Sequence, residues 1–280
     1  MACGMQKYRH GYITAKQYGD EIEFCLIKTQ RTPGLECDGG KAEKGTVNDE
    51  KLANNIARAV SAVRELGRCN PWTLFFTGTF AKEKINRYAL DAIIKAVAQW
   101  IRDYNKKHGT SIKYLLVPEK HKDGAWHVHG LLYGLPMSHL KAFTLDEILP
   151  YDIRDKLKAG RRLYNWLPWA EKFGHCDVEL IRDKARSISY ITKYITKSVN
   201  GGVTELGKHM YLASQGLERA VTLKEGFIDN CGKYLDEFFA NGFENEYVRK
   251  ISFNLNDETA LNAALDFMAQ MKTEHEMRSG

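Results

Sequence analysis

Two β-type runs joined by a short turn constrain the fold of this chain more than any other feature. Residues 113–119 and 127–133 are rich in leucine, valine and aromatic side chains, and Asp123-Gly124 lies between them. An Asp-Gly step between such runs is a hairpin signal, although the join is longer than the tightest turns. The two runs are therefore predicted to pair as antiparallel strands.

Other segments show strand or helix periodicity on either side of this hairpin. Alternating or β-branched runs predict strands at three places: residues 21–26, 73–80 and 178–181. Apolar residues at helical spacing predict four helices, over residues 52–66, 90–101, 186–199 and 261–271. Residues 151–173 read as a helix-rich insert, and the glycine-rich residues 30–46 as a mobile loop.

The first predicted helix carries its own boundary signals. Asn48 or Asp49 is expected to cap its start, and Gly67 stands where a helix commonly ends. The second helix is expected to end near Gly109.

Hairpin-type joins and intervening helices together predict the α+β class, with a central antiparallel sheet and flanking helices. A parallel doubly wound sheet is disfavoured, because no glycine-rich phosphate loop follows a strand. We expect three segments. Residues 1–69 supply strands, a loop and a helix packed on the core, residues 70–200 form the core, and residues 201–280 form a partly helical extension with a mobile tail.

Composition limits the classes of protein to consider. The 280 residues carry a net charge of +6, a mild surplus that fits a nucleic-acid partner without requiring one. Apolar runs are too short to span a membrane, and the N-terminus lacks a signal-peptide core. The six cysteines show no paired spacing, so they predict reduced thiols in the cytoplasm rather than a zinc site.

Two histidines alternate with a valine at the start of the second run, Trp-His-Val-His-Gly. On a strand, His127 and His129 project to one face. Glu119 and His121 end the first run, so a carboxylate and up to three imidazoles are predicted to converge across the hairpin. Two histidines and a carboxylate suit a catalytic Mn²⁺ or Mg²⁺ site, with Glu119 as third ligand and His121 as the alternative. Ordinary polar positions on a half-buried strand are the competing interpretation.

The helix predicted over residues 186–199 presents chemistry beside its apolar stripe. Tyr190 and Tyr194 lie away from that stripe and stand one above the other, four residues apart. Lys193 and Lys197 form a parallel row. A phenol is a poor nucleophile at neutral pH, but nearby ammonium groups and a metal ion stabilise the phenolate and offset charge on a phosphodiester. These side chains therefore predict attack on a phosphodiester.

Three motifs in this order resemble the HUH-type rolling-circle replication initiators of small phages and plasmids. Residues 75–80, Phe-Phe-Thr-Gly-Thr-Phe, resemble the first motif, residues 126–132 the second and residues 190–197 the third. The resemblance covers about residues 70–200 and implies a ferredoxin- or RRM-like HUH sheet.

The resemblance also implies a function. In that family, a tyrosine attacks single-stranded origin DNA, forms a 5′-phosphotyrosine link and leaves a 3′-hydroxyl primer, and a later transfer rejoins the ends. It implies His127, His129 and Glu119 as metal ligands and Tyr190 as first nucleophile, with Lys193 one turn away. Because Tyr190-Ile-Thr-Lys and Tyr194-Ile-Thr-Lys each resemble the one-tyrosine pattern, the number of reacting tyrosines stays open. Host helicase and polymerase are candidate partners.

Other classes of protein share some of these features. A transposase or relaxase of the same chemistry is the nearest alternative, because neither the chain length nor the tyrosine pair argues against it. A non-catalytic, sequence-specific DNA-binding protein fits the charge but gives the tyrosines no role. A histidine-triad hydrolase is disfavoured, because Leu131 stands where a third histidine is needed.

Side chains near the motifs are candidates for DNA contact as well. Four cations are candidates to line a backbone path: Lys184, Arg186, Lys193 and Lys197. Three aromatic residues are candidates to stack bases, with core packing as the favoured alternative for the tryptophans: Tyr164, Trp166 and Trp169. Arg161-Arg162 reads as a solvated charge pair, with phosphate contact as the alternative.

Overall fold

The computed structural model describes residues 8–9, 11–28, 30–31, 49–200, 210–227 and 232–272. The chain forms two compact units, one from the described parts of residues 1–43 and 219–280, the other from those of residues 44–218. The loop predicted over residues 30–46 lies outside the described residues from residue 32 onward, and so does the tail from residue 273.

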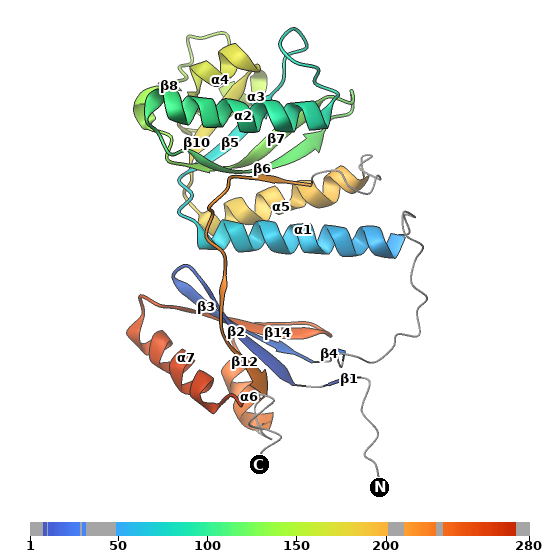
Figure 1. Ribbon diagram of the computed structural model, residues 1–280. Coiled ribbons are helices and arrows are strands. Elements are labelled where there is room, and N and C mark those ends of the chain that lie inside the picture. Colours follow the sequence, from blue (N-terminus) through green and yellow to red (C-terminus); the bar gives the residue numbers. More distant parts are fainter. Residues whose placement is uncertain are drawn as a thin grey trace. The chain divides into compact units, whose positions relative to one another are not determined.

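The unit of residues 44–218 is built on a seven-stranded sheet in which every described strand pair is antiparallel (Figure 1). The strand order is β11-β6-β7-β5-β10-β9-β8. The strands are β5 (Leu74–Thr79), β6 (Lys113–Lys120), β7 (Trp126–Tyr133), β8 (Lys141–Ala142), β9 (Leu163–Asn165), β10 (Cys176–Leu180) and β11 (Leu212–Ala213). The central hairpin predicted from the sequence is β6 and β7.

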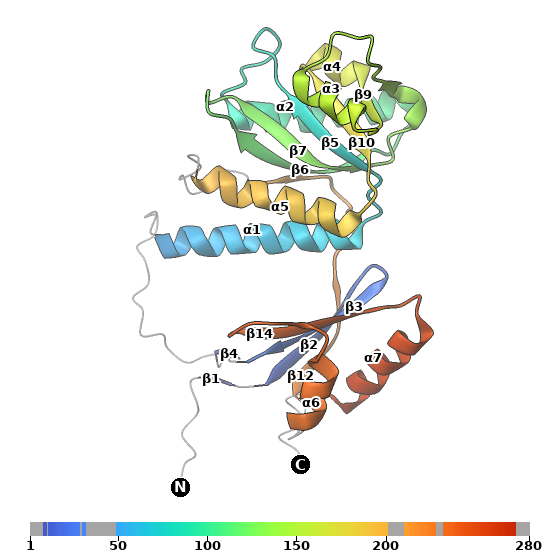
Figure 2. The ribbon, with the colours of Figure 1, turned by 180° about the vertical axis from the view of Figure 1, so that it is seen from behind.

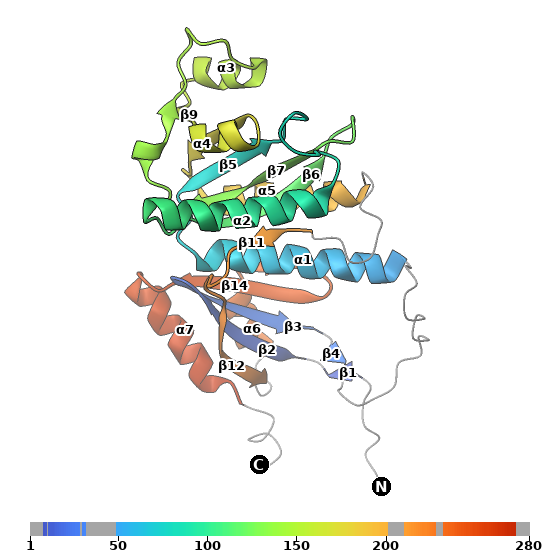
Figure 3. The ribbon, with the colours of Figure 1, turned by 45° about the horizontal axis from the view of Figure 1, so that its top comes forward.

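Helices cover both faces of this sheet. The helices are α1 (Asp49–Cys69), α2 (Leu90–His108), α3 (Tyr151–Lys158), α4 (Leu167–Lys172) and α5 (Lys184–Asn200), with a 3-10 turn at Met137–His139. In Figure 3, α2 lies in front of the strands and α5 behind them. Residues of α2 and α4 pack with alternate residues of β5, β6 and β7 in one core, and residues of α1 and α5 pack with the opposite residues in another.

Periodicity and an end signal explain α2. Leu90, Ile93, Val97 and Ile101 recur at helical spacing and are all buried. Gly109 ends the helix with φ 63°, and its backbone N–H donates to the carbonyl of Asn105. The predicted helix and its end are confirmed.

The end predicted for the first helix is wrong. Helix α1 continues past Gly67 to Cys69. A Cβ atom at Gly67 would lie 2.7 Å from Cγ1 of Ile188 in α5. The glycine therefore serves a close approach of two helices rather than a helix end.

The insert over residues 151–173 contains α3 and α4 as predicted, and also the short strand β9 between them (Figure 2). Trp166 and Trp169 are fully buried and pack with Phe76 and Trp100. The favoured interpretation of these two tryptophans, core packing, is therefore confirmed, and base stacking by them is ruled out because they are fully buried.

The other unit is a five-stranded antiparallel sheet in the order β12-β2-β3-β14-β13. Its elements are β2 (Tyr12–Tyr18), β3 (Glu21–Ile27), β12 (Val221–Phe227), α6 (Gly232–Phe239), β13 (Phe243–Glu244), β14 (Val248–Asn254) and α7 (Glu258–Gln270), and β1 (Tyr8–Arg9) pairs separately with β4 (Gln30–Arg31). Ile13, Phe24 and Leu26 of the sheet pack with Phe239 and Phe267 of the helices.

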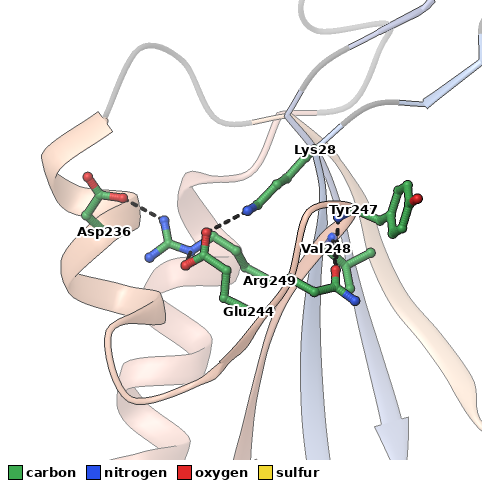
Figure 4. A network of polar contacts seen from close by, with 7 residues as sticks. Lys28, Asp236, Glu244, Tyr247, Val248 and Arg249 are labelled. Carbon is green, nitrogen blue, oxygen red and sulfur yellow. Dashed lines mark hydrogen bonds and ion pairs between the residues drawn. The ribbon is translucent and has the colours of Figure 1, made fainter.

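A polar network ties the ends of this sheet to α6 (Figure 4). Arg249 Nη1 donates to Asp236 at 2.6 Å, and its Nε lies 3.1 Å from Glu244. Lys28 Nζ also donates to Glu244, at 2.6 Å. The Arg249 guanidinium lies over the ring of Phe239 at 5.5 Å, so it joins β14, β13 and α6.

The predicted α+β class with antiparallel strands and flanking helices is confirmed. The structure contains two large sheets, whereas the sequence predicts one central sheet. Its two units also divide the chain differently from the three expected segments, because α1 belongs with the seven-stranded sheet and strands from both ends of the chain share the other. Among the described residues, no helix is long and apolar enough to cross a membrane.

Candidate active site

The β6–β7 hairpin places the predicted metal ligands on one face of the sheet. Glu119 lies directly opposite His127, and Val117 lies opposite His129. Directly paired residues share a face, so these side chains lie on the side covered by α5. The adjacency predicted from the hairpin is confirmed by this register.

The carboxylate and the imidazoles are in contact. Glu119 Oε2 lies 2.8 Å from His129 Nε2 and 3.9 Å from His121 Nε2. The rings of His121 and His127 are stacked with centroids 3.6 Å apart. Glu119 and His129 are buried, with 6% and 9% of their surfaces exposed. A buried carboxylate and a buried imidazole therefore satisfy each other here.

The donor types fit a divalent cation, although the described residues contain no group of three His, Cys, Asp or Glu side chains arranged to hold one. Metal–ligand bonds of about 2.1 Å place neighbouring ligand atoms about 3.0–3.4 Å apart. The 2.8 Å between Glu119 and His129 would have to open by a few tenths of an ångström. Nδ1 of His129 is buried and has no hydrogen-bond partner among the described residues.

His127 is neutral under ordinary conditions. Burial lowers the pKa of His127, and the neighbouring His121 and His129 add to this, so that the pKa falls to about 4 although Glu119 and Asp123 oppose the shift. A neutral imidazole is the form that binds a metal ion. At neutral pH no proton therefore competes for this ring.

Helix α5 brings both tyrosines to this cluster. Ile188, Ile191 and Ile195 are buried against α1 and the sheet, as the apolar stripe predicts. The Tyr194 ring stacks on His129, with centroids 4.1 Å apart and planes within 6°. Tyr190 is one turn earlier and 47% exposed.

The two phenols are hydrogen-bonded to each other. Tyr194 donates to the oxygen of Tyr190 at 2.6 Å, and the Tyr190 ring rests edge-on against Phe75. Burial raises the pKa of Tyr194, and the bond to Tyr190 raises it further. Tyr194 therefore keeps its proton and presents it to the exposed phenol.

The structure describes the side chains of only some of the lysines predicted to contact DNA. Lys193 lies on α5 with an exposed side chain. Lys197 belongs to the same helix, but its side chain lies outside the described residues. Lys184 donates to the backbone carbonyl of Arg68 at 2.7 Å, so its ammonium group joins α5 to the end of α1.

Strand β5 explains the first motif. Thr77 lies opposite His129, and Thr79 lies opposite His127, so both threonines share the face of the histidines. A Cβ at Gly78 would lie 2.7 Å from the Trp169 ring on the opposite face. The motif thus combines two polar positions beside the site with a glycine that admits the core tryptophan.

Sequence reasoning missed Asp177. Asp177 of β10 lies opposite Thr77, so it shares the face of His129, and only 6% of its surface is exposed. Burial raises its pKa, which Lys156 at 3.6 Å partly offsets. The sequence predicts a strand from residue 178; extending it by one residue would have placed Asp177 on the face opposite Val178.

Residues 73–199 match the sequence model of a family of replication-associated proteins, the one named for ORF2. The match covers less than half of the 280 residues, and it includes the three motifs, Glu119 and Asp177. It supports a replication initiator of the Rep type. No curated protein and no solved structure matches the chain.

Proposed function

We propose that this protein nicks and rejoins single-stranded origin DNA through a 5′-phosphotyrosine intermediate, in the manner of HUH replication initiators. The observation that carries the proposal is the stack of Tyr194 on His129. It joins the histidine strand to the tyrosine helix and brings a carboxylate, imidazoles and two phenols to one site. The family match supports the replication setting.

Tyr190 is the proposed first nucleophile. Its phenol is exposed, so a DNA strand can reach it, whereas Tyr194 is held against His129. The hydrogen bond from Tyr194 stabilises negative charge on the Tyr190 oxygen. As the Tyr190 O–H loses its proton to water, its oxygen forms a bond to phosphorus. The bond from phosphorus to the 3′-oxygen breaks, and that oxygen takes a proton to become the 3′-hydroxyl.

Glu119, His127 and His129 would hold a Mg²⁺ or Mn²⁺ ion, with His121 as the alternative to Glu119. Such an ion, when bound, withdraws charge from the phosphate oxygens. The chain's own contribution is to align the phenols. Tyr194 cannot turn without losing its stack on the imidazole, and Tyr190 packs against Phe75.

Rejoining requires an acceptor for the bound 5′ end. A 3′-hydroxyl that attacks the phosphotyrosine restores a phosphodiester and returns the phenol. Tyr194 lies four residues from Tyr190 and is hydrogen-bonded to it, so in the proposed mechanism it would act on a second strand once Tyr190 is occupied. Whether one or both tyrosines react is decided by the experiment below.

The test uses fluorescent single-stranded oligonucleotides that tile a candidate origin, with the full chain and Mn²⁺, Mg²⁺ or EDTA. We expect a covalent adduct that survives denaturing electrophoresis and needs the metal ion. Tyr190→Phe should abolish it, and Tyr194→Phe should slow it. Tyr151→Phe is the matched control, because Tyr151 is 81% exposed on α3 and should behave like the natural chain.

Mass spectrometry of the adduct peptide identifies the linked tyrosine. Linkage to Tyr194 in the natural chain would reverse the assigned order. A full set of tiles that bind but give no adduct with either metal would favour the non-catalytic DNA-binding protein. A transposase or relaxase would give the same adduct on DNA from a transposon end or a transfer origin.

A further inference from the structure

Arg161, two residues before β9, is held at the edge of the site face by a carboxylate of the sheet. Its Nε donates to Glu179 Oε1 at 2.8 Å, and its Nη2 donates to Glu179 Oε2. Glu179 lies on β10 directly opposite Phe75, the residue on which the Tyr190 ring rests. Arg161 is therefore fixed beside the strand pair that supports the exposed phenol.

The groups around Arg161 also indicate that its guanidinium lies near Tyr190. The hydrogen bond to Glu179 raises the pKa of the guanidinium, and Asp177 and Tyr190 are close enough to raise it as well. Helix α3, in the same insert, supplies a second cation. Lys156 of α3 lies 3.6 Å from Asp177 and 3.9 Å from Asp152.

Both cations are tied to carboxylates that share one face of β10. Asp177 and Glu179 are two residues apart on the strand, so both project to the side of the sheet that carries His129 and the tyrosines. Their side chains are 9% and 13% exposed, whereas those of Lys156 and Arg161 are 30% and 43% exposed. The carboxylates are thus covered, and the cations are the outer members of each pair.

We propose that Arg161 and Lys156 form a binding site for the phosphodiester backbone of single-stranded nucleic acid beside Tyr190. The site rests on the proposed function, because it would hold the strand that the tyrosine attacks. Nothing in the three motifs includes these residues, which come from the insert between β8 and β10.

The guanidinium chemistry allows both contacts at once. A bidentate pair through Nε and Nη2 uses one edge of the planar group and leaves the Nη1 edge for a phosphate oxygen. An acidic strand would otherwise repel DNA at this position. Glu179 instead orients Arg161, so the pair lowers the entropy that the arginine loses on binding phosphate.

Arg162 provides an internal contrast. It has the same charge and is the next residue in the chain, and it is also exposed. No ion pair of Arg162 occurs among the described residues. If position rather than charge matters, the two arginines should differ.

The test measures the affinity of the full chain for a fluorescent 30-nucleotide single strand from about 50 to 300 mM NaCl in EDTA. All proteins carry Tyr190→Phe, so that no cleavage occurs. For single strands each phosphate contact contributes about 0.7 to the slope of log affinity against log salt. We expect Arg161→Gln to reduce the magnitude of the slope by about 0.7 and Arg162→Gln to leave it unchanged. Lys156→Gln and its exposed neighbour Lys158→Gln form a second matched pair.

The outcomes separate this proposal from the proposed function. Equal slopes for the Arg161 and Arg162 variants, with both folded by circular dichroism, would overturn the site. Arg161→Lys keeps the charge without the bidentate geometry, and it should recover part of the slope. Proteins with the natural Tyr190 could form adducts normally while Arg161→Gln leaves the salt dependence of single-strand binding unchanged. That result would disprove the backbone-binding site and leave the nicking proposal standing. If no adduct forms but the slope changes as expected, only the nicking chemistry fails.

Discussion

His129 is the residue at which the hairpin and α5 meet. Its Nε2 contacts Glu119, and its ring carries Tyr194. A change at this position therefore acts on the metal ligands and on the alignment of the phenols together. His127 is less buried and contacts His121 instead, so its role is more local.

The double variant His127→Ala/His129→Ala tests both roles. We expect DNA cleavage to fall below detection, because the ligand pair and the support for Tyr194 are both removed. Mn²⁺ binding, measured by isothermal titration calorimetry, should weaken by at least about tenfold, as for other loss of metal-orienting groups. Full cleavage by this variant would disprove the metal site. Single-strand binding in EDTA serves as the control for folding.

The depressed pKa of His127 gives the metal-free protein a pH dependence. Because the folded pKa is about 4 and the ordinary value is 6.5, the unfolded chain binds more protons between these values. The stability that the neutral imidazole of His127 contributes is therefore fully present above about pH 6.5 and is lost as the pH falls toward 4. The full shift corresponds to about 3 kcal/mol, and partial solvent exposure reduces this to about 1–2 kcal/mol.

Urea unfolding in EDTA at pH 7 and pH 4.5 measures this loss. Glutamine cannot titrate in the His127→Gln variant. Between pH 7 and pH 4.5, the free energy of unfolding of this variant should therefore fall by about 1–2 kcal/mol less than that of the natural chain. The same fall in both proteins would mean that other groups account for the acid sensitivity.

At the scale of single residues, the local sequence pattern predicted some of the contacts around the candidate site and not others. Strand alternation and the hairpin predicted that the strand ends with Glu119 and His127 lie close together. The exact register, with Glu119 opposite His127, comes from the structure. Helical spacing alone predicted that Tyr190 and Tyr194 lie outside the apolar stripe of their helix. Asp177 was not recognised, and Arg161 was interpreted as half of a solvated charge pair rather than as the partner of Glu179. The roles of both residues depend on β10 lying next to β5, a contact between distant segments.

Among the elements, the packing of α1 on α5 determines where the tyrosines lie. Gly67 of α1 contacts Ile188 of α5, and Ile188 precedes Tyr190 by two residues. Any residue larger than glycine at position 67 must displace Ile188 or the helix that carries it. The sequence signal at Gly67 was ambiguous, since a helix end and a close helix contact both select glycine.

The Gly67→Ala substitution has two opposing effects on stability, a gain in helix propensity and a cost from overpacking. Alanine favours the helix by about 1 kcal/mol, but a Cβ atom 2.7 Å from Ile188 Cγ1 creates overpacking that costs about 1–3 kcal/mol. We expect a net loss of about 1 kcal/mol in the free energy of unfolding, measured in urea, and slower adduct formation. Ile188→Val in the same chain removes a methyl group and should restore part of both. A more stable Gly67→Ala protein would show that α5 yields without strain.

For the whole molecule, the sequence predicted the class of fold better than the division of the chain. In the five-stranded sheet, the sequence predicts only β3, through the alternation of Ile22, Phe24 and Leu26. Strand β3 pairs with β14, and its neighbour β2 pairs with β12, so both pairings join segments some two hundred residues apart that no periodicity can connect. The residues of the candidate site, by contrast, all come from one unit, residues 44–218.

That division predicts that residues 44–218 fold and act alone. The unit contains its own hydrophobic cores, the three motifs and Arg161. Its last residue is also anchored, because Asn70 donates to the carbonyl of Glu218 at 3.0 Å and accepts from its N–H at 2.9 Å. A fragment ending at residue 218 therefore keeps β11 paired with β6. We expect cooperative unfolding in urea and a metal-dependent adduct with the tyrosine dependence of the full chain. A fragment that folds but forms no adduct, where the full chain does, would place part of the active site in the other unit.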